Sequence, residues 1–425
     1  MKRDPLVWFA GLRERYGGLA ALRLGPVRYL GVNDPELIRQ VLVDDARGYK
    51  KGLVLERTRA VLGEGLLTSE GELHRHHARL AAPAFGHRRV AGYHLAMREL
   101  AEQTSAGWRD GQELDVNVEM TRLTLRIVVR TLFGTTMEPA EADRVGASLT
   151  ALLEHFDWLV THPLGPLRLR IPTPRIRSFR AARASIHDTV DRLVAERSAG
   201  GTAGDDLLSA LLGAREDDGG GMDPVLLRDE VVTLLLAGHE TTANWLTFTW
   251  LVLAEHPAVE ARLHAELDRV LGTVPVQAAD LERLPYLRAV LEETLRLYPP
   301  AWGVGRRALE RRSLGGYDVP RRAVLGLSQF AVHRDARFWP EPERFDPERW
   351  LDPSAARVPR GAFFPFGDGP RRCIAEHFAR AEAGIVMATL ARAWSLDRVS
   401  HEPVELEAKV TLRPRGGLRM RVSAR

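Results

Sequence analysis

The chain's single cysteine, Cys373, lies in the stretch FPFGDGPRRCIA at residues 364–375. Gly367 and Gly369 allow a tight turn whose backbone N–H groups can point at the sulfur, and the helix predicted to start at Ile374 adds the positive end of its dipole. Both features favour the thiolate over the thiol. A thiolate with amide donors is a metal ligand or a nucleophile, whereas a lone cysteine without them is usually a small buried side chain.

His377 follows Cys373 by four residues, a spacing that also suggests a zinc site or a cysteine hydrolase dyad. Zinc would need two further ligands, and the chain has no second cysteine to provide them. A hydrolase would take its general base from another element, whereas His377 lies one turn further along the same predicted helix. Both alternatives are therefore disfavoured.

The longest apolar segment predicts one helix over residues 223–256, with an Asp-Pro start and a proline directly after its end. At 1.5 Å per residue such a helix is roughly 50 Å long, and it must be buried. A transmembrane helix is the alternative, but the polar stretch AGHETTAN at 237–244 would be penalised in a bilayer. We therefore expect a buried helix in a protein without a membrane anchor.

The polar stretch indicates a notch in that helix. Gly238 lowers helix stability and removes a side chain, while Glu240 places a carboxylate in an apolar element. Thr241 can donate a hydrogen bond to the carbonyl of Ala237, and such a bond bends a helix. Either a flat group approaches at Gly238, or these residues are a satisfied buried polar pair without a catalytic task.

Composition limits the compartment and the partners. One cysteine excludes an internal disulfide, so a cytoplasmic protein is expected. The first 25 residues carry charges and lack the apolar run of a signal peptide. The 60 basic and 56 acidic residues are interspersed without an aromatic-interleaved basic stripe, so we expect no nucleic-acid partner.

Helical periodicity covers most of the chain. It is clearest at 34–44, 92–108, 116–133, 140–160, 178–197 and 258–270. Strand signals are few and short, and they lie at 19–32, 314–320, 323–328 and 410–422. No compositional linker divides the sequence, so we expect residues 1–425 to form a single, mainly α domain with a small β region.

The chain resembles the cytochromes P450, because it contains four motifs in the order in which that family has them. They are AGHETT at 237–242, ETLR at 293–296, PERW at 347–350 and the cysteine loop FGDGPRRCIA at 366–375. The loop is the most specific. The Glu-x-x-Arg pattern alone carries no weight, because it also occurs at 36–39, 119–122 and 266–269; its value comes from the order and from the adjoining LYPP. The resemblance extends over essentially the whole chain.

This resemblance implies the P450 fold, a triangular single domain that holds haem b between the long helix and the cysteine loop. Cys373 would be the axial thiolate on the iron, a ligand that favours O–O cleavage of the co-substrate O2. Phe366 would cover the sulfur and Gly367 would allow the turn. Ala375 stands where the family usually has glycine, which tightens the approach of the next helix to the haem.

Residues of the long helix would act on the opposite face of the haem. Gly238, next to Ala237, would lie against that face. Thr241 would hold dioxygen and a water, and Glu240 would relay protons so that oxygen is cleaved and not released as peroxide. His239 is expected to be structural.

Charged residues would surround the cysteine loop and the haem propionates. Glu293, Arg296 and Arg349 would form the family's buried ion network behind the loop, and such a network needs every partner. Arg371 and Arg306 would pair with the propionates.

The segment GELHRHHARLAAPAF at 71–85 departs from the family pattern. His74 fits the first position of a propionate-binding pair, but Ala78 fills the second, where the family often has Arg or His. The adjacent His76 and His77 are interpreted as solvated residues of a polar helix.

The implied function is monooxygenation of a lipophilic small molecule, of a terpenoid, fatty acyl or polyketide-like class, in secondary metabolism. The pocket would be lined by the 50–67 segment and by Leu234, Ala237, Ala301, Trp302, Val304 and the turn near Thr411. A peroxide-driven or isomerising haem-thiolate enzyme is one alternative, although such enzymes lack the pair formed here by Glu240 and Thr241. A non-catalytic haem sensor or ligand carrier is the other.

Electrons from NAD(P)H would arrive through a ferredoxin or flavodoxin and its reductase. A basic footprint for that acidic partner would comprise Arg75, Arg79, Arg372 and Arg380. We expect the protein to be a monomer.

Overall fold

The computed structural model describes residues 4–161, 171, 173–199, 204, 206–214, 222–352 and 358–425. The contacts divide the chain into two units. Unit 1 contains Met1–Glu56, Arg288–Ile374 and Leu406–Arg413, and unit 2 contains Arg57–Leu287, Ala375–Glu405 and Pro414–Arg425. Each unit is described by itself, and the expectation of a single domain stays a prediction.

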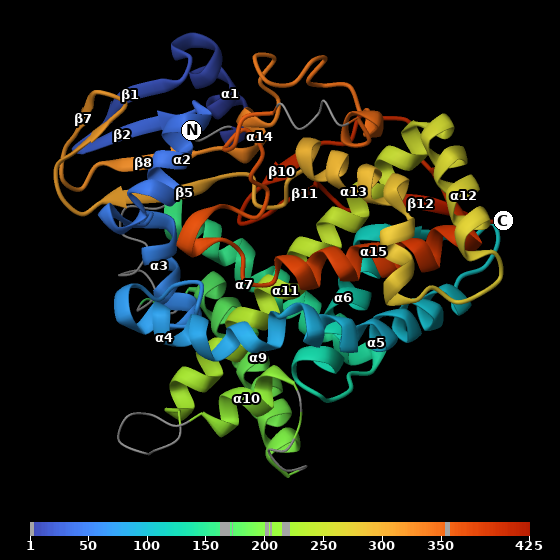
Figure 1. The fold of residues 1–425 in the computed structure, drawn as a ribbon. Coiled ribbons are helices and arrows are strands. Elements are labelled where there is room, and N and C mark those ends of the chain that lie inside the picture. The colour runs from blue at the N-terminus through green and yellow to red at the C-terminus, as the bar shows by residue number, and fades with distance from the viewer. Residues whose placement is uncertain are drawn as a thin grey trace. The chain divides into compact units, whose positions relative to one another are not determined.

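A five-stranded sheet organises unit 1 (Figure 1), in the order β1-β2-β8-β5-β3. Only β2 and β8 are parallel. The strands of unit 1 are β1 (Leu19–Leu24), β2 (Val27–Val32), β3 (Tyr49–Lys51), β5 (Val304–Ala308) and β8 (Val324–Leu327), with the pairs β6 (Arg312–Leu314) and β7 (Tyr317–Val319), and β10 (Leu406–Ala408) and β11 (Leu412–Pro414). The signals at 19–32 and 323–328 thus predict strands correctly, and the structure makes β2 and β8 neighbours.

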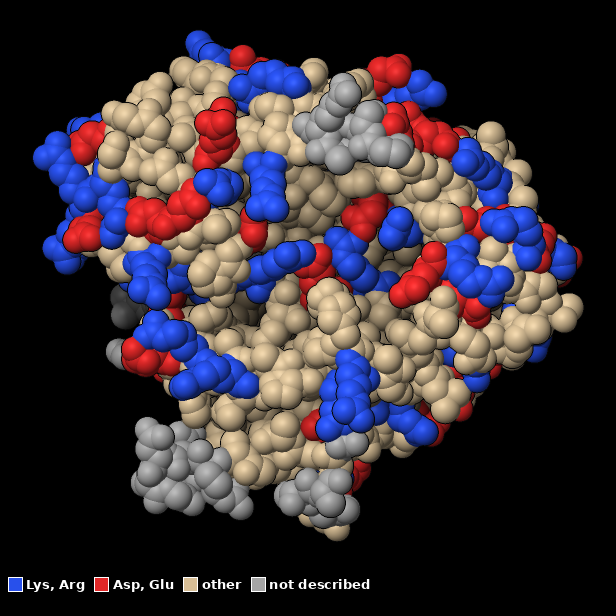
Figure 2. Space-filling view, viewed as in Figure 1, with Lys and Arg blue, Asp and Glu red and all other residues tan. Residues whose placement is uncertain are grey.

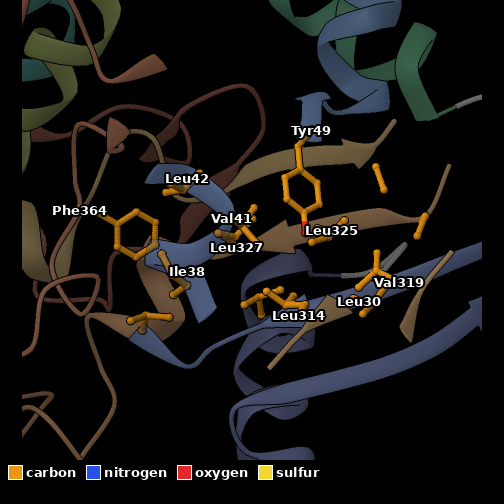
Figure 3. Close-up of a cluster of buried hydrophobic side chains, with 14 residues drawn as sticks. Leu30, Ile38, Val41, Leu42, Tyr49, Leu314, Val319, Leu325, Leu327 and Phe364 are labelled. Carbon is orange, nitrogen blue, oxygen red and sulfur yellow. The ribbon is translucent and has the colours of Figure 1, made fainter. Parts of the chain in front are cut away.

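Short helices cover this sheet. They are α1 (Pro5–Tyr16), α2 (Pro35–Arg39), which continues as a π-helical turn over Gln40–Asp44, and α14 (Gln329–Val332). Helix α2 begins where Asp34 accepts hydrogen bonds from two backbone N–H groups ahead of Pro35. Its apolar face completes a buried cluster with the sheet (Figure 3), in which Ile38 and Leu42 meet Leu325 and Leu327.

Unit 2 is built of long helices. They are α4 (Gly71–Ala81), α5 (His87–Ala106), α6 (Val116–Leu132), α7 (Pro139–Thr161), α9 (Pro174–Ala199), α10 (Leu207–Gly213), α11 (Pro224–Glu255), α12 (Pro257–Leu271) and α15 (Glu376–Ala393). A three-stranded sheet in the order β4-β12-β9 joins them, with β4 (Glu113–Asp115), β9 (Trp394–Arg398) and β12 (Arg419–Ala424). Helices α3 (Leu53–Leu62) and α13 (Pro285–Leu297) run across a boundary between the units.

Helix α11 matches the predicted long helix. Asp223 accepts hydrogen bonds from the N–H groups of Val225 at 2.7 Å and Leu226 at 3.2 Å, and Pro224 occupies the first helical position. Among the described residues, no helix combines the length and apolar composition that crossing a bilayer requires.

Helix α6 packs along α11, and side-chain hydrogen bonds set the register of the pair. The amide of Asn117 donates to Oδ1 of Asn244 at 2.9 Å, and the hydroxyl of Thr124 donates to the carbonyl of His239 at 3.1 Å. Both partners on α11 are buried. The position of the polar stretch along α11 is therefore fixed against its neighbour.

Charges of both signs share the surface. Figure 2 shows one face of the molecule, on which Lys and Arg side chains alternate with Asp and Glu. Several of the exposed arginines form ion pairs, for example Arg311 with Asp318 at 2.6 Å.

Candidate functional site

The cysteine loop of unit 1 is held by its own backbone. The N–H of Cys373 donates to the carbonyl of Phe366 at 2.9 Å, and the N–H of Gly367 donates to the carbonyl of Phe364 at 2.9 Å. Cys373 is exposed. Helix α15 begins at Glu376 rather than at the predicted Ile374. The loop therefore presents its thiol outward on a turn closed by main-chain hydrogen bonds.

Gly369 is required where the loop meets the core. Its φ is +69°, and a Cβ on it would lie 2.0 Å from the carbonyl oxygen of Leu42. On the other side of the turn, Phe364 is buried in the cluster of unit 1, and Figure 3 shows its ring beside Leu42 and Ile38. The cysteine loop is thus docked on the α2 segment both by close backbone approach and by an aromatic side chain.

The two arginines expected at the propionates have partners in unit 1. Arg371 donates from Nη1 to the carbonyl of Ala46 at 3.0 Å and from Nη2 to the carbonyl of Tyr49 at 2.9 Å. Arg306 lies on β5, is 4% exposed, and donates from Nη1 to the carbonyl of Gly305 at 3.0 Å. Arg371 therefore also fastens the cysteine loop to β3 and to the segment before it.

Glu293 of α13 collects a set of donors inside unit 1. Its carboxylate receives both Nε and Nη2 of Arg296 at 2.8 Å, and Nε of Arg349 at 2.9 Å. It also accepts from the indole of Trp350 at 2.8 Å and from the N–H of Asp346 at 3.0 Å. Glu293 and Arg296 have no exposed surface. The structure thus brings Glu293, Arg296 and Arg349 together as one satisfied buried network.

His333 joins this network to the cysteine loop, and sequence reasoning missed it. Arg296 donates from Nη1 to the carbonyl of His333 at 2.8 Å, while the N–H of Phe364 donates to Nε2 of the His333 ring at 3.0 Å. Burial, with the charge of Arg296, holds the pKa of His333 well below its usual value. His333 is therefore a neutral acceptor. A contact made through backbone groups has no signature in residue types, so nothing in one sequence could have indicated it.

The polar stretch of α11 forms a notch in unit 2. Thr241 donates from Oγ1 to the carbonyl of Ala237 at 2.8 Å. Ala237 is exposed and Gly238, Glu240 and Thr241 are partly exposed, whereas Val231 to Leu236 are all buried. The middle of this helix thus presents a small open surface that carries a hydroxyl and a carboxylate.

The neighbours of Gly238 and His239 are helix residues. A Cβ on Gly238 would lie 3.0 Å from Cγ2 of Val128 on α6, so the packing of α6 is a sufficient reason for glycine here. Nδ1 of His239 lies 2.6 Å from the carbonyl of Leu235, and burial lowers the pKa of His239 to about 4. His239 is a neutral core residue, as expected, while contact of Gly238 with a cofactor stays a prediction.

A buried acid supports the notch from α15. Glu382 has no exposed surface, and burial raises its pKa well above the usual range, with the hydroxyl of Thr242 as the smaller, opposing influence. Thr242 directly follows Thr241. Sequence reasoning did not select Glu382, because nothing in its neighbourhood distinguishes it from the exposed acids of other helices.

His74 and His77 lie on α4 in different surroundings. Nδ1 of His74 lies 3.2 Å from the carbonyl of Leu66. The prediction that His77 is solvated is wrong, because His77 is 1% exposed and contacts the carboxylate of Glu230 on α11. By helical spacing His77 lies with Leu73 and Leu80 on the apolar face of α4, and the prediction did not use that spacing.

The expected pocket residues are divided between the units. Leu234 lies buried on α11 in unit 2. In unit 1, the ring of Trp302 packs against Phe9 and its indole donates to the carbonyl of Lys409 at 2.9 Å. Thr411 is buried, and Ala301 and Val304 are partly buried. Trp302 thus packs in the core of unit 1, against helix α1.

The residues of each unit, taken by itself, fit a haem. In unit 1, Cys373 presents an exposed thiol on a turn that is closed by main-chain hydrogen bonds. A cysteine thiolate is one of the axial ligands that proteins use for haem iron. The open strip at Ala237 and Gly238 lacks bulky side chains, which suits the approach of a flat apolar group. Cys373 would hold the iron, and Arg306, Arg371 and His74 are the groups that the prediction assigns to the haem carboxylates.

The family comparison agrees with this donor set. Residues 2–419 match the family model described as Cytochrome P450. Two similar curated proteins come from Streptomyces melanosporofaciens. Cyclooctat-9-en-7-ol 5-monooxygenase is 39% identical over 395 residues, which cover 93% of this chain and 85% of the relative. Cyclooctatin synthase is 39% identical over 424 residues, which cover 99% of this chain and 91% of the relative.

A third relative is named as an oxygenase. Pentalenene oxygenase of Streptomyces avermitilis is 36% identical over 430 residues, which cover 100% of this chain and 94% of the relative. The similarity therefore extends through both units.

Proposed function

The chain belongs to the cytochrome P450 family and is a haem-thiolate monooxygenase; from this premise we propose that its substrate is a terpenoid hydrocarbon or alcohol. The names of three relatives support this substrate class, since they denote a cyclic alkenol, cyclooctatin and pentalenene. The bound haem b would supply the activation of O2, with one oxygen atom inserted into the substrate and the other leaving as water.

Cys373 carries the proposal, and we assign it the axial thiolate. The exposed thiol sits on a turn that is closed by hydrogen bonds from the N–H groups of Cys373 and Gly367 to the carbonyls of Phe366 and Phe364. The network at Glu293 and the neutral ring of His333 stiffen that turn from behind.

We assign proton handling to Glu240 and Thr241. The hydroxyl hydrogen of Thr241 is donated to the carbonyl of Ala237, so its oxygen lone pairs are left to accept from a water. Glu240 precedes it on the same partly exposed strip and can pass protons to that water.

We further propose that a ferredoxin or flavodoxin with its reductase delivers the electrons to a cytoplasmic monomer. Arg79 and Arg372 are exposed, whereas Arg75 pairs with Glu72, and Arg380 pairs with Glu376 at 3.0 Å. If these arginines guide an acidic partner, turnover must fall as salt rises. If turnover does not depend on the salt concentration, these arginines do not guide the redox partner.

The absorption spectrum of the dithionite-reduced protein with carbon monoxide tests the central assignment. Thiolate ligation gives a strongly red-shifted Soret band, and Cys373→Ser must abolish it. A histidine-type band in the wild type, or no haem band, would overturn the function. Product analysis with cyclic terpene hydrocarbons and alcohols, compared with fatty acids, then tests the substrate class.

A further inference from the structure

A groove of about 620 Å³ lies on the five-stranded sheet of unit 1, where the first residues of the parallel strands β2 and β8 line it. Its apolar wall includes Leu22, Val27 and Leu53, which are all partly exposed. Its charged lining residues are four arginines and one acid, namely Arg28, Arg307, Arg321, Arg322 and Asp318. The groove has the volume of a small-molecule site and a lining that is both apolar and strongly basic.

The acids at this groove already have cationic partners. The carboxylate of Asp318 accepts from Nε of Arg311 at 2.6 Å and from Nη2 of Arg311 at 3.1 Å. Arg307 donates from Nη1 to the carboxylate of Glu56 at 2.8 Å. The charges of the three other arginines in the lining are therefore not matched by these carboxylates.

Arg28 faces another arginine across the sheet. It lies directly opposite Arg23 in the antiparallel pair of β1 and β2, and like charges in such positions repel. Its charge acts on Asp318, but the guanidinium of Arg28 makes no hydrogen bond or ion pair with any residue that the structure describes. An anion in the groove would relieve the repulsion between Arg23 and Arg28.

Arg322 occupies a backbone position that favours glycine. The N–H of Ala323 donates to the carbonyl of Pro320 at 3.0 Å, which closes a turn with Arg321 and Arg322 at its centre. The φ of Arg322 is +68°, in the left-handed region where a side chain is strained and where turns usually have glycine or asparagine. Within the described part of the chain, the guanidinium of Arg322 has no hydrogen-bond or ion-pair partner that would account for an arginine here. Strained positions of this kind are found most often at ligand sites.

We propose that this groove binds a free amphiphilic anion, an organic phosphate with an apolar tail. A guanidinium binds a phosphate group through two parallel N–H donors, so Arg28 and Arg322 would hold the head group. The tail would cover the partly exposed wall at Leu22 and Leu53. We assign a single free molecule rather than a membrane surface, because the apolar wall and the arginines lie within one groove. The site belongs to unit 1 alone and does not depend on the proposed function.

Calorimetric titration of the haem-loaded full chain with dodecyl phosphate, below its micelle concentration, tests the site. The Soret band is recorded in parallel, since an amphiphile could also bind near the haem. We expect one binding event that leaves the Soret band unchanged and weakens as salt rises. Dodecyltrimethylammonium, with the same tail and the opposite charge, and inorganic phosphate, without a tail, should each bind at least about tenfold more weakly.

Two results of these titrations would overturn the proposal. Heat that appears only together with a Soret change would place dodecyl phosphate at the haem. Binding to vesicles that contain phosphatidic acid, without binding of free dodecyl phosphate, would make this face a membrane contact.

Arg322→Gly separates ligand binding from folding. Glycine adopts a positive φ without strain, so this variant should unfold at no lower urea concentration than the wild type, yet bind dodecyl phosphate about tenfold more weakly. Arg28→Gln should weaken binding by a similar factor, and it covers the case in which Arg322→Gly alters the turn. Arg15→Gln is the matched control, because Arg15 is an exposed arginine of α1 that does not line the groove. Wild-type affinity in both groove variants, or an equal loss in Arg15→Gln, would overturn the proposal.

Discussion

The ring of His333 and the backbone of Phe364 form one hydrogen bond of 3.0 Å, with the N–H of Phe364 donating to Nε2. Through this bond the buried ion network reaches the cysteine loop, because the carbonyl of His333 accepts from Arg296. The network is therefore more than a source of stability: it fixes where the turn that carries Cys373 begins.

Replacing His333 by leucine tests that connection. The N–H of Phe364 would stay buried without an acceptor, and we expect a loss of about 1–3 kcal/mol in the free energy of unfolding, with faster loss of haem. Urea unfolding and haem transfer to an acceptor protein measure the two effects. His401→Leu, at an exposed site, is the control. If both variants lose haem at the same rate, His333 does not hold the cysteine loop in place.

Neutralising Glu293 should be more severe. Glu293→Gln leaves Arg296 as a buried charge without its counterion, and breaking such a pair costs about 3–5 kcal/mol. The double variant Glu293→Met with Arg296→Met removes both charges, so it should unfold at higher urea concentration than Glu293→Gln. A double variant less stable than the single one would show that the carbonyl contacts of Arg296 dominate.

The sequence predicted those parts of the site whose residue types and spacing carry information. The long helix follows from its caps and its apolar length, and Glu293, Arg296 and Arg349 follow from the order of the motifs. Strands β3, β4, β5, β9 and β10 were missed, since strands of three to five residues depend on distant pairing rather than on local pattern.

The residues that the sequence did not indicate share a physical cause. The ring of His333 accepts from the backbone N–H of Phe364, Glu382 is buried by the contact of two helices, and His77 contacts a residue more than 150 positions away. Such contacts depend on tertiary packing. A helical wheel of α4 does separate His77 from His76, because it places His77 beside Leu73 and Leu80 on the apolar face, so the burial of His77 was overlooked rather than hidden.

Thr241→Ala tests proton handling at the notch. Loss of the hydroxyl should release oxygen as hydrogen peroxide and lower product formed per NADPH by about tenfold. Thr249→Ala is matched to it, because Thr249 also donates to a carbonyl four residues earlier, that of Trp245 at 2.9 Å, but lies among buried residues. If the two variants form the same amount of product per NADPH, Thr241 has no role in proton handling.

Glu382→Gln tests the buried acid by its effect on the pH dependence of stability. Because burial raises the pKa of Glu382 in the folded protein, the folded state keeps a proton that the unfolded chain releases above about pH 4.3. The contribution to stability is therefore present at low pH and falls as pH rises, by at most about 1.4 kcal/mol per pH unit.

Glutamine mimics the neutral acid and does not titrate, so the difference in the free energy of unfolding between the variant and the wild type should grow in favour of the variant from about pH 5 to about pH 8. Thr242→Val is the control: burial is the larger cause of the raised pKa, so the slope should persist without the threonine hydroxyl. Parallel curves for wild type and Glu382→Gln would mean that Glu382 is ionised in the folded protein, and a slope lost in Thr242→Val would place the cause in the hydrogen bond instead of burial.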